Sequence, residues 1–129
     1  APPDFTAETR GDKPVESDML SNARRALAAH RYSDALKILE NAPPQFKTDV
    51  EYLSAHAMFG LKKYARAAEQ FERLGGSVRY GEAAQWFEAL SLLSDSEQNK
   101  TRAREILRTM ANDEGHTFHE EAKSLLKAL

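Results

Sequence analysis

Two short stretches in the middle of the chain decide the fold, residues 52–59 and 64–71, which read Tyr52-Leu53-Ser54-Ala55-His56-Ala57-Met58-Phe59 and Tyr64-Ala65-Arg66-Ala67-Ala68-Glu69-Gln70-Phe71. Each stretch places small and large apolar residues at the spacing of one helix face. The same pattern stands upstream at a constant offset in the numbering, where six positions correspond: Leu20 with Tyr52, Ala23 with Ala55, Leu27 with Phe59, Tyr32 with Tyr64, Ala35 with Ala67, and Leu39 with Phe71. A repeated pair of helices is therefore predicted.

A third copy of the pattern follows with a longer connection. Trp86, Ala89 and Leu93 correspond to Tyr52, Ala55 and Phe59, and Ala103 and Leu107 correspond to Ala67 and Phe71, both at a slightly larger offset than between the first two copies. The polar segment 94–100 absorbs the extra residues. A period near 34 with one helix pair per unit is typical of an α-solenoid, in which successive units bury one another's apolar faces.

Helical periodicity extends through most of the chain, and no segment alternates with the period of two that a strand requires. It predicts seven helices, at residues 18–30, 32–41, 49–61, 64–74, 80–93, 101–111 and 117–129. Ser17 or Asp18 is the expected N-cap of the first and Thr117 of the last, and Gly75-Gly76 the C-cap of the fourth. Residues 1–15 hold three of the five prolines and predict an extended arm or linker, whose Phe5 could dock on the folded domain.

The composition of the chain limits the classes of function that it can have. The chain has 129 residues, 41% of them hydrophobic, a formal net charge of −2 and no cysteine. These values predict one folded domain over residues 16–129, and they exclude disulfides, thiolate metal sites and a cysteine nucleophile. The missing basic excess argues against nucleic acid as a partner. No apolar run approaches the roughly 18 residues that a membrane-spanning helix needs.

The two central stretches resemble the tetratricopeptide repeat family. Ala55 and its neighbours match the small residues of that family's first helix, and Tyr64 matches its turn aromatic. The usual turn glycine is replaced by Lys62, and the closing proline is missing. The resemblance, over residues 16–129, implies an all-α fold: an α-α superhelix of three helix-turn-helix repeats plus a C-terminal capping helix, residues 117–129.

The later part of the chain is also similar to a group of bacterial membrane-anchored repeat proteins. The similarity lies in residues 84–90, 103–107, 113–116 and 122–126, and in the arm segment 4–11. It implies a repeat domain on the periplasmic side of the cell envelope, reached through an anchor that this chain does not contain; a cytoplasmic location is the alternative. Because the chain starts at Ala1, we expect it to be a processed or excised product.

Chemistry-bearing motifs are sparse. His116 and His119 are the one close histidine pair, with Glu120 and Glu121 beside them, but a zinc site would need both rings on one face and a third ligand. Most acidic residues fall on polar helix faces, where solvation and pairing with Lys or Arg are expected. The sequence has no phosphate-binding glycine loop and no nucleophile motif. We therefore expect no enzyme activity, no metal and no cofactor.

A binding groove is the better candidate for a site. In the family, the first helix of each repeat lines a concave surface, which implies a groove of mainly apolar character: Leu20, Arg24, Tyr52, His56, Phe59, Trp86 and Leu90. Such aromatic surfaces bind proteins, although the same aromatics could equally pack as core. The predicted function is a non-enzymatic scaffold or adaptor, a monomer or weak dimer, for a protein or peptide partner. The alternative is a structural or self-association module of the membrane-anchored protein.

Overall fold

A computed structural model describes the backbone of residues 15–129 and the side chains from Asp18 onward. Within this range the chain forms seven α-helices and no strand, which confirms the all-α prediction. The chain divides into two compact units, the first ending at Lys63 and the second running from Tyr64 to Leu129. The predicted arm, with the suggested docking of Phe5, lies almost entirely outside the described residues.

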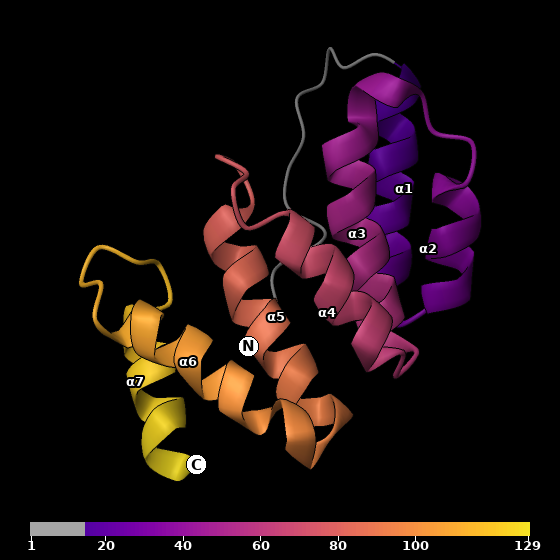
Figure 1. The fold of residues 1–129 in the computed structure, drawn as a ribbon. Helices are drawn as coiled ribbons and strands as arrows, with labels where there is room; N and C mark the ends of the chain where they lie inside the picture. The colour runs from indigo at the N-terminus through magenta and orange to yellow at the C-terminus, as the bar shows by residue number, and fades with distance from the viewer. Residues whose placement is uncertain (1–14) are drawn as a thin grey trace. The chain divides into compact units, whose positions relative to one another are not determined.

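Unit 1 holds three α-helices, α1 (Val15–Ala28), α2 (Tyr32–Leu39) and α3 (Lys47–Gly60), with a 3₁₀ turn at Pro44–Phe46 before α3 (Figure 1). All three helices contact one another. The small residues Ala23, Ala35 and Ala55 are fully buried. Their lack of bulk allows the helices to approach closely, as the repeat pattern predicts.

The turn after α1 recurs after α3 with the same backbone geometry. His30 and Lys62, which occupy equivalent positions of the first two repeats, have φ values of 60° and 66° and are the only described non-glycine residues with positive φ. At the first turn the Arg31 amide donates to the Ala26 carbonyl (2.8 Å) and the His30 amide to the Leu27 carbonyl (3.0 Å). At the second turn the equivalent donors and acceptors form the same two bonds at the same two distances: Lys63 to Met58 and Lys62 to Phe59. Both turns are Schellman caps, so the sequence repeat is also a repeat of local structure.

Replacing Lys62 with glycine is expected to raise the free energy of unfolding by about 0.5–1 kcal/mol. A left-handed conformation costs an L-residue roughly 1–2 kcal/mol, and glycine removes this cost while adding some entropy to the unfolded chain. Chemical denaturation measures the change. Lys63→Gly is the matched control, because it removes the same charge from a residue without positive φ, and it is expected to be neutral or destabilising. Equal effects of the two variants would contradict the explanation.

Unit 2 holds α4 (Tyr64–Arg73), α5 (Gly81–Asp95), α6 (Lys100–Ala111) and α7 (His119–Ala128), with a 3₁₀ turn at Glu97–Asn99. Each helix contacts the next one along the chain. One core cluster gathers residues of α5, α6 and α7: Ala89, Leu107, Met110 and Ala122. A second joins Ala68 of α4, Leu92 of α5 and Ala103 of α6. The last helix thus covers the apolar face of α6.

Three expected helix ends differ from the structure. Helix α1 already begins at Val15, so neither Ser17 nor Asp18 is its N-cap. Helix α7 begins at His119 with Phe118 at the N-cap position, so Thr117 is not its cap. Gly75 and Gly76 follow α4 as predicted, but no described glycine has a positive φ, and the helix ends through successive four-residue turns, in which the Leu74 amide donates to the Phe71 carbonyl and the Gly75 amide to the Glu72 carbonyl. At α7 the competing contact is visible, because the amide and hydroxyl of Thr117 both donate to Glu82 instead.

A buried carboxylate connects the helices of unit 2. The side chain of Glu88 on α5 is 8% exposed and accepts a hydrogen bond from Arg102 of α6 (3.1 Å), whose guanidinium also pairs with Glu72 of α4 (2.6 Å). Burial raises the pKa of Glu88, and the charge of Arg102 opposes this rise. Glu88 is therefore an exception to the expectation that most acidic residues lie on solvated faces.

Candidate functional site

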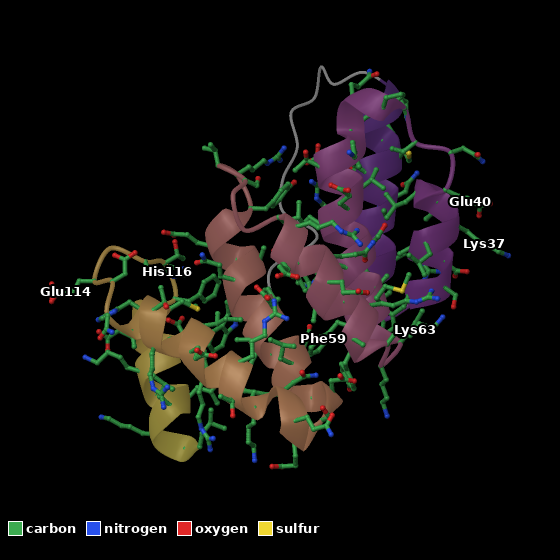
Figure 2. The ribbon with its side chains drawn as sticks, in the orientation of Figure 1. Lys37, Glu40, Phe59, Lys63, Glu114 and His116 are labelled. Carbon is green, nitrogen blue, oxygen red and sulfur yellow. The ribbon has the colours of Figure 1, made fainter. Side chains whose placement is uncertain are left out.

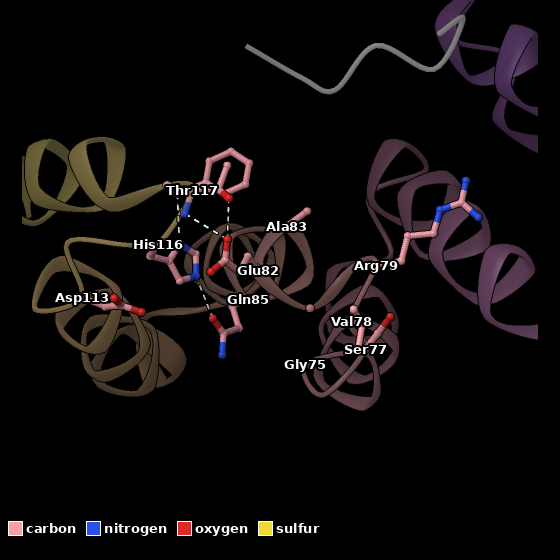
Figure 3. A pocket seen from close by; sticks show the side chains of 12 residues that line it. Gly75, Ser77, Val78, Arg79, Glu82, Ala83, Gln85, Asp113, His116 and Thr117 are labelled. Carbon is pink, nitrogen blue, oxygen red and sulfur yellow. Dashed lines mark hydrogen bonds between the residues drawn. The ribbon is translucent and has the colours of Figure 1, made fainter. Parts of the chain in front are cut away.

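A polar pocket of about 630 Å³ opens on unit 2 (Figure 3). It lies where three segments meet: the loop between α4 and α5, the first turns of α5, and the connection between α6 and α7. The lining side chains and backbone come from Gly75, Ser77, Val78, Arg79, Gly81, Glu82, Ala83, Gln85, Asp113, His116, Thr117 and Phe118. All of them belong to unit 2, so the pocket is complete within one compact unit.

The α4–α5 loop is held close to the start of α5. The Ser77 hydroxyl accepts the Tyr80 amide (3.1 Å), and the Ser77 carbonyl accepts the Gly81 amide (2.8 Å). Gly81 is buried, and a Cβ atom built there would stand 2.7 Å from the Gly75 carbonyl oxygen. Only glycine fits this approach without a backbone shift. This wall of the pocket is therefore held in place by the close approach at Gly81 and by the hydrogen bond to the Ser77 hydroxyl.

Glu82 holds the α6–α7 connection against α5. One carboxylate oxygen, Oε1, accepts both the backbone amide (3.0 Å) and the side-chain hydroxyl of Thr117 (Figure 3). These two hydrogen bonds lower the pKa of Glu82, because they stabilise the ionised form, the hydroxyl bond having the larger effect. Glu82 is thus ionised at neutral pH and serves as an anchor from one helix to a loop 35 residues later.

The ring of His116 is fixed in one tautomer. Its Nδ1 atom accepts the Phe118 backbone amide (3.0 Å), which leaves the proton on Nε2. Nε2 then donates to Oε1 of Gln85 on α5 (2.8 Å). His116 is 7% exposed, so both bonds are protected from water. The ring has no nitrogen left to take up a substrate proton or to bind a metal without breaking one of these bonds.

The pocket's chemistry therefore suits recognition. Many of its polar groups are used within the fold: the imidazole, the hydroxyls of Ser77 and Thr117, and one side-chain oxygen each of Glu82, Gln85 and Asp113. The second oxygens of the two carboxylates and the Gln85 amide nitrogen lie around a small apolar patch. Val78 stands fully exposed at its edge. Such a mixture of a few polar groups and an apolar contact is typical of a surface that holds a side chain of a partner.

The substitution Glu82→Gln is expected to loosen the α6–α7 connection. The amide oxygen of the substituted side chain would carry no charge, so its hydrogen bonds to Thr117 would be weaker than those of the carboxylate. Hydrogen exchange measures this directly: the amide of Thr117 should exchange several-fold faster, while amides of the α6 interior keep their rates. The wild-type chain should show the same loosening when the pH falls below the lowered pKa of Glu82. Unchanged exchange at Thr117 would contradict the anchoring role.

Five residues of the predicted groove belong to unit 1. Leu20, Tyr52 and His56 are buried, each less than a tenth exposed, so they do not form an open surface. The Tyr52 and His56 rings meet edge to face at 4.6 Å, one helical turn apart on α3. Arg24 and Phe59 are half-buried. Three of the five predicted lining residues are therefore buried in the structure, because this apolar face of the helix is covered.

The other two, Trp86 and Leu90, belong to α5 of unit 2, and both are half-buried. The Trp86 indole stacks on the Phe118 ring, with centroids 5.5 Å apart and an interplanar angle of 3°. Trp86 also packs against the cluster of Ala89 and Leu107. Much of the Trp86 side chain therefore packs as core, which is the alternative that the sequence left open.

The histidine pair does not converge on a metal. His116 contacts Gln85, whereas His119 donates from Nδ1 to the Met110 carbonyl (3.3 Å) and lies 3.5 Å from Glu120. Among the described residues, no group of three or more potential ligands is placed to hold a metal ion. In the same part of the chain, no helix is both long and apolar enough to cross a bilayer.

Comparison of the chain with family models, with curated proteins and with solved structures found no match. The residues and geometry of the chain itself are therefore what supports a function.

Proposed function

We propose that this chain is a tetratricopeptide-like repeat adaptor that binds a protein or peptide partner and catalyses no reaction. The observation that carries the proposal is the duplicated Schellman turn at His30 and Lys62, with the same hydrogen bonds at equivalent positions of two repeats. A duplicated helix-turn-helix is the element from which repeat proteins build long binding surfaces. The covering of α6 by α7 in unit 2 is in keeping with a capped repeat array.

The accessible part of the predicted groove is narrower than the sequence suggested. Arg24 and Phe59 in unit 1 and Leu90 in unit 2 keep partly exposed side chains. Arginine and aromatic residues are among the types that contribute most to binding at protein interfaces. We propose these three residues as partner contacts, each on the first helix of a predicted repeat.

Site-directed photo-cross-linking tests the adaptor function. A photoreactive amino acid is placed at position 24 or 90 of the full chain, with position 123 on the exposed side of α7 as the control. We expect one protein to cross-link at positions 24 and 90 but not at 123, and the purified pair to bind with defined stoichiometry. Circular dichroism confirms that each variant folds. If both positions cross-link no protein, or the same proteins as position 123, the adaptor proposal is wrong.

Self-association is the competing function. Sedimentation of the purified chain distinguishes the two, because the adaptor should be a monomer at micromolar concentration. A stable dimer whose subunits cross-link to each other through position 24 or 90 would favour the structural module.

We also propose that the adaptor works at the bacterial cell envelope. This proposal is based on the resemblance of segments within residues 84–126 to membrane-anchored repeat proteins. Fractionation of cells that make the protein tests the location.

A further inference from the structure

Unit 1 has a groove of about 500 Å³ between α1 and α2, on a surface that the predicted groove did not include. Its lining residues come from the last two turns of α1, from the turn, and from α2: Asn22, Arg25, Ala26, Arg31, Asp34, Lys37 and Ile38. We call it the basic groove. It lies within one compact unit, and Lys37 points outward from α2 (Figure 2).

The basic groove carries uncompensated positive charge. It holds Arg25, Arg31 and Lys37 against the single acid Asp34, and all four side chains are exposed. No ion pair within the described residues involves any of the four, and Arg25 donates only to the neutral amide oxygen of Asn22 (2.6 Å). Arg102 of unit 2, by contrast, is paired with two carboxylates. The charges of the groove are therefore available to a ligand.

The excess of positive charge is local to the described part of unit 1. Residues 18–63 contain seven Lys and Arg against five Asp and Glu, whereas residues 1–63 contain nine of each and the whole chain has a net charge of −2. A local positive site attracts an acidic partner segment, and acidic residues elsewhere on the chain disfavour other binding orientations of that segment.

The floor of the groove is apolar. Ala26 is 2% exposed, and Ile38 is half-buried beside it. An aliphatic side chain can rest on this floor while carboxylates on either side of it meet the three cations. Asp34 adds an acceptor that a backbone amide of the ligand can use. The basic groove thus combines an apolar contact with flanking charge.

We propose that the basic groove binds an acidic segment of the partner protein, one in which aspartate or glutamate flanks an aliphatic residue. This inference rests on the proposed adaptor function and names the chemistry of the partner. A membrane surface fits less well, because the large hydrophobic side chains exposed in the described residues are Val78 and Leu129, both in unit 2. Nucleic acid fits less well because three cations beside a carboxylate neutralise few phosphates.

Nuclear magnetic resonance titration of the full chain tests the proposal with a defined probe. The probe is a synthetic hexapeptide that alternates aspartate and leucine, and its control has asparagine in place of aspartate. We expect a dissociation constant of about 0.1–1 mM for the acidic peptide, as suits a short flexible ligand, weakening as salt is added. The shifted amides should lie within residues 22–38, and the asparagine peptide should shift them little.

Charge variants sharpen the test. Arg31→Glu and Lys37→Glu should each weaken binding about fivefold, and Lys37→Gln by less, since exposed charge pairs are worth up to about 1 kcal/mol. Asp34→Asn should strengthen binding about twofold. Lys47→Glu is the matched control, because it makes the same charge change on an exposed residue of unit 1 outside the groove.

Several outcomes would overturn the proposal. They are equal weakening by Lys47→Glu and Lys37→Glu, shifts centred outside residues 22–38, and no binding of the acidic peptide at millimolar concentration. Tighter binding of vesicles rich in anionic lipid, or of single-stranded DNA, through Arg31 and Lys37 would assign the groove to those ligands instead. A partner still captured at position 24 or 90 by the Arg31→Glu, Lys37→Glu variant would leave the adaptor function standing and remove only this site from it.

Discussion

Acidification from pH 7 to pH 4 is expected to lower the free energy of unfolding by about 3 kcal/mol through His56 alone. This histidine of α3 is 8% exposed, and burial lowers its pKa from 6.5 to about 3. At a pH between 6.5 and about 3, the unfolded chain binds a proton at His56 and the folded chain does not. Its contribution to stability is therefore fully present above pH 6.5 and is lost as the pH falls towards 3.

The His56→Leu variant isolates this effect. Its free energy of unfolding, measured with urea at pH 7 and pH 4, should fall by about 3 kcal/mol less than that of the wild type. Taking the difference between the two proteins removes the contribution of Glu88, whose raised pKa acts in the opposite direction. His30→Asn is the control, because His30 is exposed and asparagine tolerates its left-handed conformation. Parallel pH profiles for wild type and His56→Leu would contradict the burial of a neutral ring.

Replacing Gly60 with alanine is expected to destabilise the chain by about 1–3 kcal/mol, although alanine favours helices by about 1 kcal/mol over glycine. Gly60 ends α3, and a Cβ atom there would clash with Cε1 of Tyr32 at the start of α2. The Tyr32 ring is also stacked on His30, with centroids 5.8 Å apart, so its movement would disturb the first turn of the repeat. Crowding should therefore outweigh the gain in helix propensity.

A double-mutant cycle with Tyr32→Ala identifies the cause. In the Tyr32→Ala background the ring is absent, and Gly60→Ala should become neutral or slightly stabilising. The equivalent position one repeat earlier is Ala28, which is exposed, so alanine itself is acceptable at this point of a repeat helix. An equal loss of stability in both backgrounds would show that the contact between Gly60 and Tyr32 is not responsible.

The sequence located the helices well because their signal is local. The predicted ranges 64–74 and 101–111 differ from α4 and α6 by only one residue at an end. The missing turn glycine was also visible: Lys62 stands at the position where the structure has a left-handed residue. Periodicity and turn position depend on neighbours within a few residues, so one repeat of the pattern carries the information.

The candidate site could not be found in this way. Its hydrogen bonds join residues that are 31 and 35 positions apart, His116 with Gln85 and Thr117 with Glu82, and no spacing rule connects them. The basic groove was missed for a similar reason, since Arg25 and Lys37 are unremarkable on their separate helices. The sequence did contain a weak signal for it, because residues 25–37 hold three Lys and Arg but only one Asp or Glu.

The amino-acid sequence by itself determined the all-α class, the helix positions and the recurrence of the turn at Lys62, because these follow from local periodicity and turn chemistry. Only the tertiary structure decided which apolar residues are covered, so that Tyr52 and His56 became interior while Phe59 kept part of its surface. It also decided that Glu88 is buried against Arg102. The physical reason is that a helical pattern identifies the face that must be buried, whereas the neighbour that covers each residue of that face is set by the packing of whole helices.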